Sequence, residues 1–144
     1  MRFWDSSAVV PLLVPEDASE RLRRLHASDP VVIAWWGAEV ECVSAVARAE
    51  RAGRLSTPGA AEGLRRLVSL RRGWHEIEPS EDVREAAKRL VRVHDLRAAD
   101  SLHLAAALVA SESRPASLEF VCLDDRLRTA ADREGFGVVP ATDR

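Results

Sequence analysis

The hydrophobic and polar positions along this 144-residue chain predict short apolar strands that alternate with amphipathic helices. Runs of β-branched and aromatic residues bounded by Pro, Gly, Asp or Ser are typical of buried strands, and they occur at residues 2–4, 31–34, 74–77, 120–123 and 138–139. Apolar residues three and four positions apart predict helices at residues 8–14, 16–27, 36–52, 58–71, 80–94, 98–110 and 126–134. This alternation favours right-handed crossovers and a mostly parallel sheet. We therefore expect an α/β protein with a single domain over residues 1–144.

Several of these helices carry a pattern that predicts which side chains are buried. In the helix at residues 36–52, the expected inward stripe is Val40, Val43, Val46 and Ala47. In the helix at residues 80–94, it is Val83, Ala87, Leu90 and Val91. The helix at residues 98–110 consists mostly of Ala and Leu, and a helix that is apolar on every side is typical of a central, buried position. Pro11 falls early enough in the helix at residues 8–14 to be tolerated in its first turn.

Composition excludes some classes of protein and leaves nucleic acid open as a partner. The absence of any long apolar run argues against a membrane span, and the N-terminal residues lack the pattern of a signal peptide, so we expect a cytoplasmic protein. Net charge is −2, but the basic residues are 20 arginines and one lysine, Lys88. Arginine binds phosphate well through its planar, forked donors. Cys42 and Cys122 are isolated in the sequence, which predicts buried free thiols rather than a zinc site.

The first strand is followed directly by a carboxylate and two hydroxyls, in the segment Phe3-Trp4-Asp5-Ser6-Ser7. We interpret Asp5 as the last residue of the strand and Ser6 or Ser7 as the cap of the following helix, because Ser oxygens accept from the free N–H groups of a first helical turn. Ligands of open α/β sheets bind at the carboxyl ends of the strands. Asp5 is therefore a candidate site residue, and a purely capping role is the alternative.

Three further acids have comparable positions. Asp124 ends the strand at residues 120–123, Asp100 lies in the first turn of the Ala-rich helix, and Glu41 lies one turn into the helix at residues 36–52. Each has a structural explanation by itself, such as the preference of Asp100 for the positive end of a helix dipole. In a parallel sheet, however, all four acids would meet at one edge.

Clustered carboxylates repel one another and are pushed toward the neutral form unless a cation lies among them. Oxygen ligands without His or Cys suit Mg²⁺ or Mn²⁺. Such an ion can clamp phosphate oxygens and activate a water for in-line attack on a phosphodiester. The four acids therefore predict a metal-dependent phosphodiesterase.

Four segments together resemble a PIN domain, and more narrowly the VapC toxins of bacterial type II toxin–antitoxin systems. They are Trp4-Asp5-Ser6-Ser7-Ala8, residues 40–48, residues 97–105 and Leu123-Asp124-Asp125-Arg126-Leu127. The likeness covers essentially the whole chain. It implies a three-layer α/β/α fold with a central, mostly parallel sheet, and a Mg²⁺- or Mn²⁺-dependent ribonuclease. It also implies a homodimer and a cognate VapB antitoxin that inserts a segment near the acidic pocket.

The resemblance implies that Asp5, Glu41, Asp100 and Asp124 form the metal site, assisted by the hydroxyl of Ser6 or Ser7, of which we favour Ser7. Glu39 is the alternative to Glu41, but only Glu41 fits the pattern Val-Glu-x-x-Ser-Ala-x-Ala-Arg that ends at Arg48. Asp125 is the alternative to Asp124.

Other polar and aromatic residues are open to more than one interpretation. His103, one turn after Asp100, fits a packing or hydrogen-bonding role better than that of a ligand. Trp36 would lie near the mouth of the pocket, where an exposed indole could stack on RNA bases, whereas the other tryptophans are expected to pack. Arg48, Arg51 and Arg54 share a helical face that could meet RNA phosphates or an acidic antitoxin segment. The alternative function is a non-catalytic PIN-like binding module, or an antitoxin-pairing protein with an inactive acidic pocket.

Overall fold

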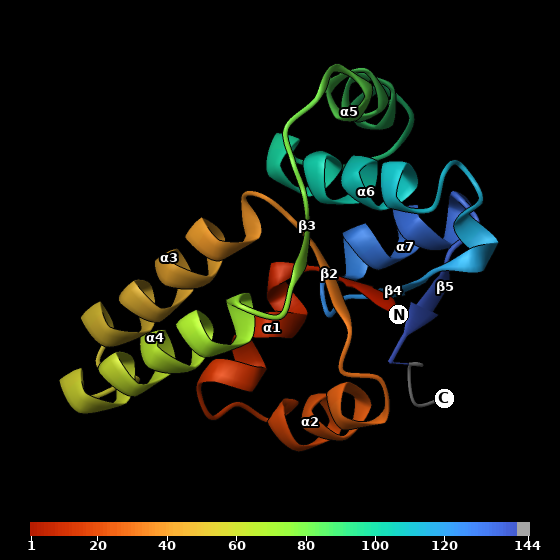
Figure 1. Ribbon diagram of the computed structural model, residues 1–144. Coiled ribbons are helices and arrows are strands. Elements are labelled where there is room, and N and C mark those ends of the chain that lie inside the picture. The colour runs from red at the N-terminus through yellow and green to blue at the C-terminus, as the bar shows by residue number, and fades with distance from the viewer. Residues whose placement is uncertain (141–144) are drawn as a thin grey trace.

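The computed structural model describes residues 1–140 and has a five-stranded parallel sheet at its centre (Figure 1). The strands are β1 (Arg2–Trp4), β2 (Val32–Trp35), β3 (His75–Ile77), β4 (Glu119–Val121) and β5 (Gly137–Val139). Their order across the sheet is β3-β2-β1-β4-β5. The chain adds β2 and β3 on one side of β1 and then crosses back to place β4 and β5 on the other. The strand order therefore reverses between β1 and β4.

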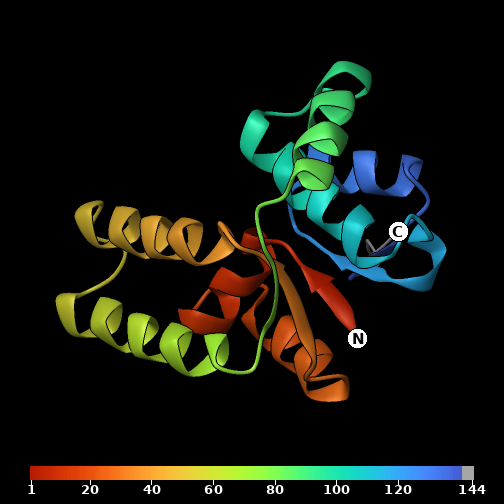
Figure 2. The same cartoon turned by 45° about the horizontal axis from the view of Figure 1, so that its top comes forward.

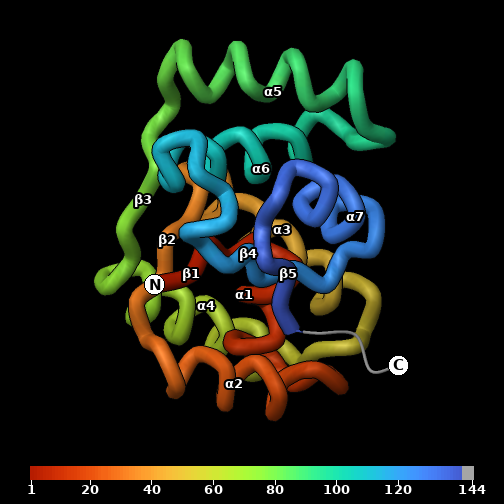
Figure 3. Tube along the Cα trace, turned by 90° about the vertical axis from the view of Figure 1, so that its right-hand side faces the viewer, coloured from red at the N-terminus to blue at the C-terminus, as the bar shows by residue number. Residues whose placement is uncertain are grey.

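Helices cover both faces of this sheet (Figure 3). One face carries α1 (Ser6–Leu13), α2 (Ser19–Ser28), α3 (Ala38–Arg51) and α4 (Thr57–Arg71), and the other carries α5 (Glu81–Val93), α6 (Ala98–Ala110) and α7 (Asp125–Arg133). A short 3₁₀ turn, η1 (Pro115–Ser117), precedes β4. This arrangement confirms the predicted three-layer α/β/α fold. The expected single domain also takes in residues 141–144, which lie outside the described part of the chain.

The strands alternate between two hydrophobic cores because successive side chains of a strand point to opposite faces. Phe3, Ile33 and Phe120 pack with α5, α6 and α7, and the rings of Phe3 and Phe120 stack with their centroids 5.4 Å apart. Trp4 and Val121 pack with α1 to α4 on the opposite face. Both faces are covered, which explains why β1, β2 and β4 carry apolar residues on both faces rather than alternating apolar and polar ones.

Two boundaries of helices and strands differ from the prediction, one beside Asp5 and one beside Asp124. Asp5 follows β1 and is itself the N-cap of α1, because its side chain accepts from the Ser7 N–H; Ser6 and Ser7 are already helical. Pro11 consequently lies inside α1 beyond the first turn. Strand β4 ends at Val121, so Asp124 does not end the strand; it caps α7, after Cys122 and Leu123.

The predicted inward stripes of two helices were partly wrong. Val40 and Val43 are 68% and 41% exposed, and the buried residues of α3 are Ala38, Cys42 and Val46. Helices α3 and α4 extend together to one side of the sheet (Figure 2), so only the stripe of α3 that faces α1 and α4 is buried. On α5, Val83, Ala87 and Leu90 are buried as predicted, whereas Val91 is exposed.

Helix α2 begins at Ser19, three residues later than predicted. The Ser19 hydroxyl accepts from the Glu16 N–H and donates to the Val14 carbonyl, which closes a turn where the prediction placed helix.

Cys42 and Cys122 are buried free thiols, as predicted. Among residues 1–140, the helices are all too short or too polar to cross a membrane.

Candidate active site

Asp5 and Asp124 follow neighbouring strands at the point where the strand order reverses. The Asp5 N–H donates to the Val121 carbonyl at 2.9 Å, so the end of β1 is tied directly to the end of β4. Open α/β sheets bind ligands outside the carboxyl ends of their strands at such a reversal. The fold therefore makes the edge at which these two acids lie the expected ligand-binding edge of the sheet.

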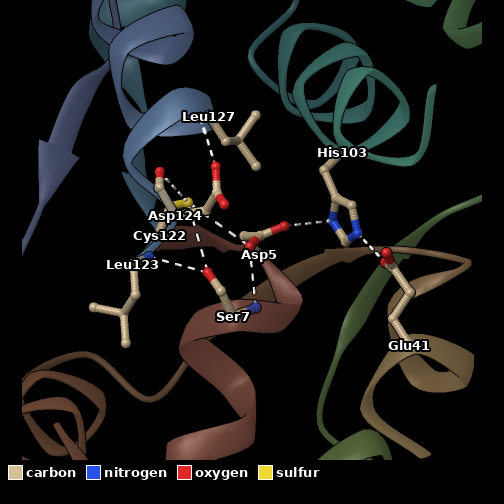
Figure 4. A network of polar contacts seen from close by, with 8 residues as sticks. All are labelled: Asp5, Ser7, Glu41, His103, Cys122, Leu123, Asp124 and Leu127. Atoms are coloured by element: carbon tan, nitrogen blue, oxygen red, sulfur yellow. Dashed lines mark hydrogen bonds and ion pairs between the residues drawn. The ribbon is translucent and has the colours of Figure 1, made fainter. Parts of the chain in front are cut away.

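Asp5 divides its two carboxylate oxygens between two tasks. Its side chain is only 5% exposed, and Oδ2 accepts from the Ser7 N–H at 3.0 Å, which caps α1. Oδ2 also lies 3.7 Å from the Cys122 thiol. Oδ1 lies 3.3 Å from Nδ1 of His103 (Figure 4). Asp5 is thus both the capping residue and a member of a buried polar network.

Ser7 is the hydroxyl that joins this network. Its Oγ accepts from the Leu123 N–H at 3.0 Å and lies 3.6 Å from Sγ of Cys122. These contacts fix the first turn of α1 against the segment that leads from β4 to Asp124. Burial, reinforced by the charge of Asp5, raises the pKa of the Cys122 thiol, which therefore stays neutral.

His103 connects two of the predicted acids from the opposite helical layer. Its imidazole is buried, with Nδ1 facing Asp5 and Nε2 in contact with Oε2 of Glu41 (Figure 4). Burial by itself disfavours the charged imidazolium, but the carboxylates of Asp5 and Glu41 outweigh it and raise the His103 pKa. His103 therefore connects two acids, by a hydrogen bond with Glu41 and an ion-pair contact with Asp5, and the sequence spacing from Asp100 was the only sign of this role.

Asp100 lies on α6 one turn before His103 and is within range of the charges of the other acids. Burial raises its pKa, and the negative charges of Asp124, Asp5 and Glu41 raise it further, while His103 opposes them. Asp124 is exposed, and its Oδ1 accepts from the Leu127 N–H at 2.9 Å. The four predicted acids thus gather at one edge of the sheet.

The two alternative acids have different surroundings. Glu39 forms an ion pair with Arg71 of α4, with 3.1 Å between Oε2 and Nε. Asp125 lies in the first turn of α7, and its side chain makes no hydrogen bond or ion pair with any other described residue. Neither side chain contacts the network around Asp5.

The donor set fits a hard divalent cation in chemistry and in charge. Its members offer carboxylate oxygens, which Mg²⁺ and Mn²⁺ prefer. The raised pKa of Asp100 reflects burial first and then repulsion by the neighbouring carboxylates, which a cation would relieve. Within residues 1–140, no three His, Cys, Asp or Glu side chains converge closely enough to hold a metal ion in their present positions. His103 already engages Asp5 and Glu41.

Residues 2–133 match the PIN domain family. Two curated proteins of Mycobacterium tuberculosis, Ribonuclease VapC45 of strain CDC 1551 / Oshkosh and Ribonuclease VapC49 of strain ATCC 25618 / H37Rv, are each 31% identical to the chain over 139 residues. Each alignment covers 96% of this chain and 94% of the relative.

Solved structures show the same fold. The Mycobacterium tuberculosis VapC20, described as a Sarcin-Ricin loop cleaving toxin, has a TM-score of 0.68 at 19% identity and covers 97% of this chain and 100% of its own. A toxin–antitoxin complex from Klebsiella pneumoniae has a TM-score of 0.64 at 18% identity and covers 97% of both chains. FitAcB from Neisseria gonorrhoeae has a TM-score of 0.65 at 19% identity and covers 96% of both.

Proposed function

Because this chain belongs to the PIN-domain family and is a relative of the VapC ribonucleases, we propose that it is a metal-dependent endoribonuclease, the toxin of a VapBC-type pair. The observation that carries the proposal is the gathering of Asp5, Glu41, Asp100 and Asp124 at the reversal point of the sheet, where Asp100 feels the charges of the other three. The two ribonuclease relatives, aligned along nearly their whole length, support RNA as the substrate.

In this proposal the four carboxylates hold Mg²⁺ or Mn²⁺. The bound ion would stabilise negative charge on the phosphate and lower the pKa of the attacking water. Asp5 and Asp124 each cap a helix with one carboxylate oxygen, and the second oxygen of Asp5 faces His103. Their helices, α1 and α7, direct positive dipole ends toward the same edge, which favours an anionic phosphate there.

Ser7 and His103 would position the acids. Ser7 holds the first turn of α1 against the segment before Asp124, so that the acids that follow β1 and β4 keep a fixed separation. His103 holds the Glu41 carboxylate on the Asp5 side of α3. We extend the proposal to a VapB-like antitoxin partner, a homodimer and a cytoplasmic site of action. The antitoxin partner is supported by one structural neighbour, which is a toxin–antitoxin complex.

The test is cleavage of a pool of structured RNAs by the purified protein with Mg²⁺ or Mn²⁺, compared with EDTA. Asp5→Asn is the first variant, because Asn caps a helix about as well as Asp and the protein should still fold. We expect Asp5→Asn to lower cleavage by about 100-fold or more, the scale of losing one group that stabilises developing charge. Manganese binding by calorimetry, without RNA, should weaken in parallel.

Two matched pairs of variants test the site assignment. Glu41→Gln and Asp124→Asn should abolish cleavage, whereas Glu39→Gln and Asp125→Asn should leave it unchanged. The reverse pattern in either pair would move the site to the alternative acid. A folded protein that binds no metal and cleaves no RNA would favour the non-catalytic binding module instead.

A further inference from the structure

A pocket of about 530 Å³ lies beside the acidic site, between the N-terminal ends of α3 and α5 and the first turns of α6. Trp35, Trp36, Pro79, Arg84 and Leu102 are among the residues that line it. This volume falls within the roughly 300–1,000 Å³ of small-ligand sites. The pocket is therefore large enough for one planar group of a larger ligand.

Trp36 is held at this pocket with its indole toward solvent. Trp35 ends β2 and is buried, and its ring passes so close to Gly37 that a Cβ there would lie 2.6 Å from Nε1. The Trp36 N–H donates to the Ile77 carbonyl at 3.0 Å, yet the side chain is 51% exposed. The backbone at Trp36 is thus tied to β3, while its large apolar ring is open to solvent, where a ligand can stack on it.

The pocket shares helix α6 with the acidic site and lies just before the start of α3, the helix that carries Glu41. The Glu41 N–H donates to the Gly37 carbonyl at 3.2 Å, so Glu41 lies one helical turn from the residue that follows Trp36. Leu102 lines the pocket, and the next residue of α6, His103, contacts Glu41. A group bound against Trp36 would therefore be a near neighbour of a group bound among the acids.

We propose that Trp36 and this pocket receive an unpaired base of the RNA, adjacent to the phosphodiester that is cleaved; this rests on the proposed ribonuclease function. Proteins read single-stranded RNA by stacking its bases on aromatic rings and on arginine guanidinium planes. Arg84 supplies such a plane, and its charge is balanced by Glu81 at 2.7 Å, so that the pocket selects a base rather than a phosphate.

A second, larger pocket shows the contrast. It has a volume of about 800 Å³ and lies between α5, the end of α6 and η1, but no aromatic residue lines it. Its charged residues are mostly acidic, and its arginine, Arg89, is already bound to Glu134. Acidic side chains repel the RNA backbone, so size alone does not make this pocket a base subsite.

The test is the affinity for a labelled, short single-stranded RNA of mixed sequence, measured in an Asp5→Asn background that does not consume the probe. Adding Trp36→Ala should weaken binding by about 5- to 150-fold, the effect of removing one stack between a base and an aromatic ring. Trp36→Phe should retain most of the affinity. Val68→Ala, which truncates an exposed apolar residue of α4, is the matched control and should change nothing.

An abasic oligomer of the same length provides the second readout, because it has the phosphates and lacks the bases. It should bind equally to the protein that retains Trp36 and to the protein that carries Trp36→Ala, a result that general damage to the RNA surface would not produce. Melting temperatures of the variants establish that they are folded.

Two results would overturn the proposal in distinguishable ways. If the protein with Asp5 intact cleaves RNA, and Trp36→Ala binds and cleaves it equally well, the base subsite is wrong while the ribonuclease stands. Weakened self-association of that variant in sedimentation would then assign the indole to a protein interface. If the protein with both residues intact neither binds nor cleaves any RNA of the pool, both proposals fail.

Discussion

The imidazole of His103 contacts the carboxylate of Glu41 and thereby joins helices that cover opposite faces of the sheet. Helix α6 brings His103 from one layer, and α3 brings Glu41 from the other. Their side chains meet beyond the carboxyl ends of the strands, where Asp5 lies 3.3 Å from the second ring nitrogen. Acids from separate layers are thus held together by a single buried side chain.

Replacing His103 with Ala should destabilise the protein by about 2–4 kcal/mol, because a buried side chain is lost and the Asp5 carboxylate keeps no cationic neighbour. His103→Gln should cost less, since its amide can still donate to one carboxylate. Urea denaturation at neutral pH measures both. Equal stability of His103→Ala and the parent protein would show that the contact contributes nothing to folding.

Ser7→Ala should lower the free energy of unfolding by about 1–3 kcal/mol, because the Leu123 N–H loses its acceptor in a partly buried position. Ser6→Ala is the matched control, since in the described structure the Ser6 hydroxyl makes no hydrogen bond. Its effect should stay within about 0.5 kcal/mol. Chemical denaturation of both variants decides between the two hydroxyls, and a larger effect at Ser6 would contradict the assignment.

Gly37→Ala should cost about 1–3 kcal/mol, because the added methyl would overlap the Trp35 indole, 2.6 Å from Nε1. Gly73→Ala is a suitable comparison, since its nearest contact would be the Leu70 carbonyl at an ordinary 3.7 Å. That substitution should be neutral or stabilise the protein by up to about 1 kcal/mol. Thermal melts compare the two, and a harmless Gly37→Ala would mean that Trp35 can shift freely.

Truncation of two valines of α3 should change the free energy of unfolding by different amounts. Val46→Ala removes buried methyl groups and should cost about 2 kcal/mol. Val40→Ala alters a side chain that is 68% exposed, and its effect should stay within about 0.5 kcal/mol. Denaturant titration measures both. A comparable loss at Val40 would indicate that this face is buried in solution, as it would be in a homodimer.

Glu134 should give a measurable acid dependence of stability. Hydrogen bonds from Arg89 lower its pKa against the effect of burial, and the hydrogen bond with His94 lowers it further. A lowered acid pKa contributes stability that is fully present above the unfolded value of about 4.3 and is lost as pH falls through the folded value. The stability difference between the parent protein and Glu134→Gln should therefore be largest near neutral pH and shrink on acidification. A constant difference would contradict this origin.

The order and type of the elements could be predicted from the sequence because they depend on local patterns. Each of the seven predicted helices and five predicted strands has a counterpart within residues 1–140, with bounds that differ by a few residues. Position relative to these elements also identified Asp5, Glu41, Asp100 and Asp124 as candidates. Caps were harder, because Asp5, Ser6 and Ser7 all suit an N-cap, and only the hydrogen bond from the Ser7 N–H distinguishes them.

The tertiary structure decided which residues of α3 are buried and which side chains contact each acid. Periodicity gives a helix an apolar stripe, but packing against α1 and α4 selected Ala38 and Cys42 for burial and left Val40 exposed. Strand order, and with it the reversal between β1 and β4, arises from long-range pairing that no local pattern encodes. The contact between His103 and Glu41 follows from it, because residues 62 positions apart meet only when the sheet brings α3 and α6 to the same edge.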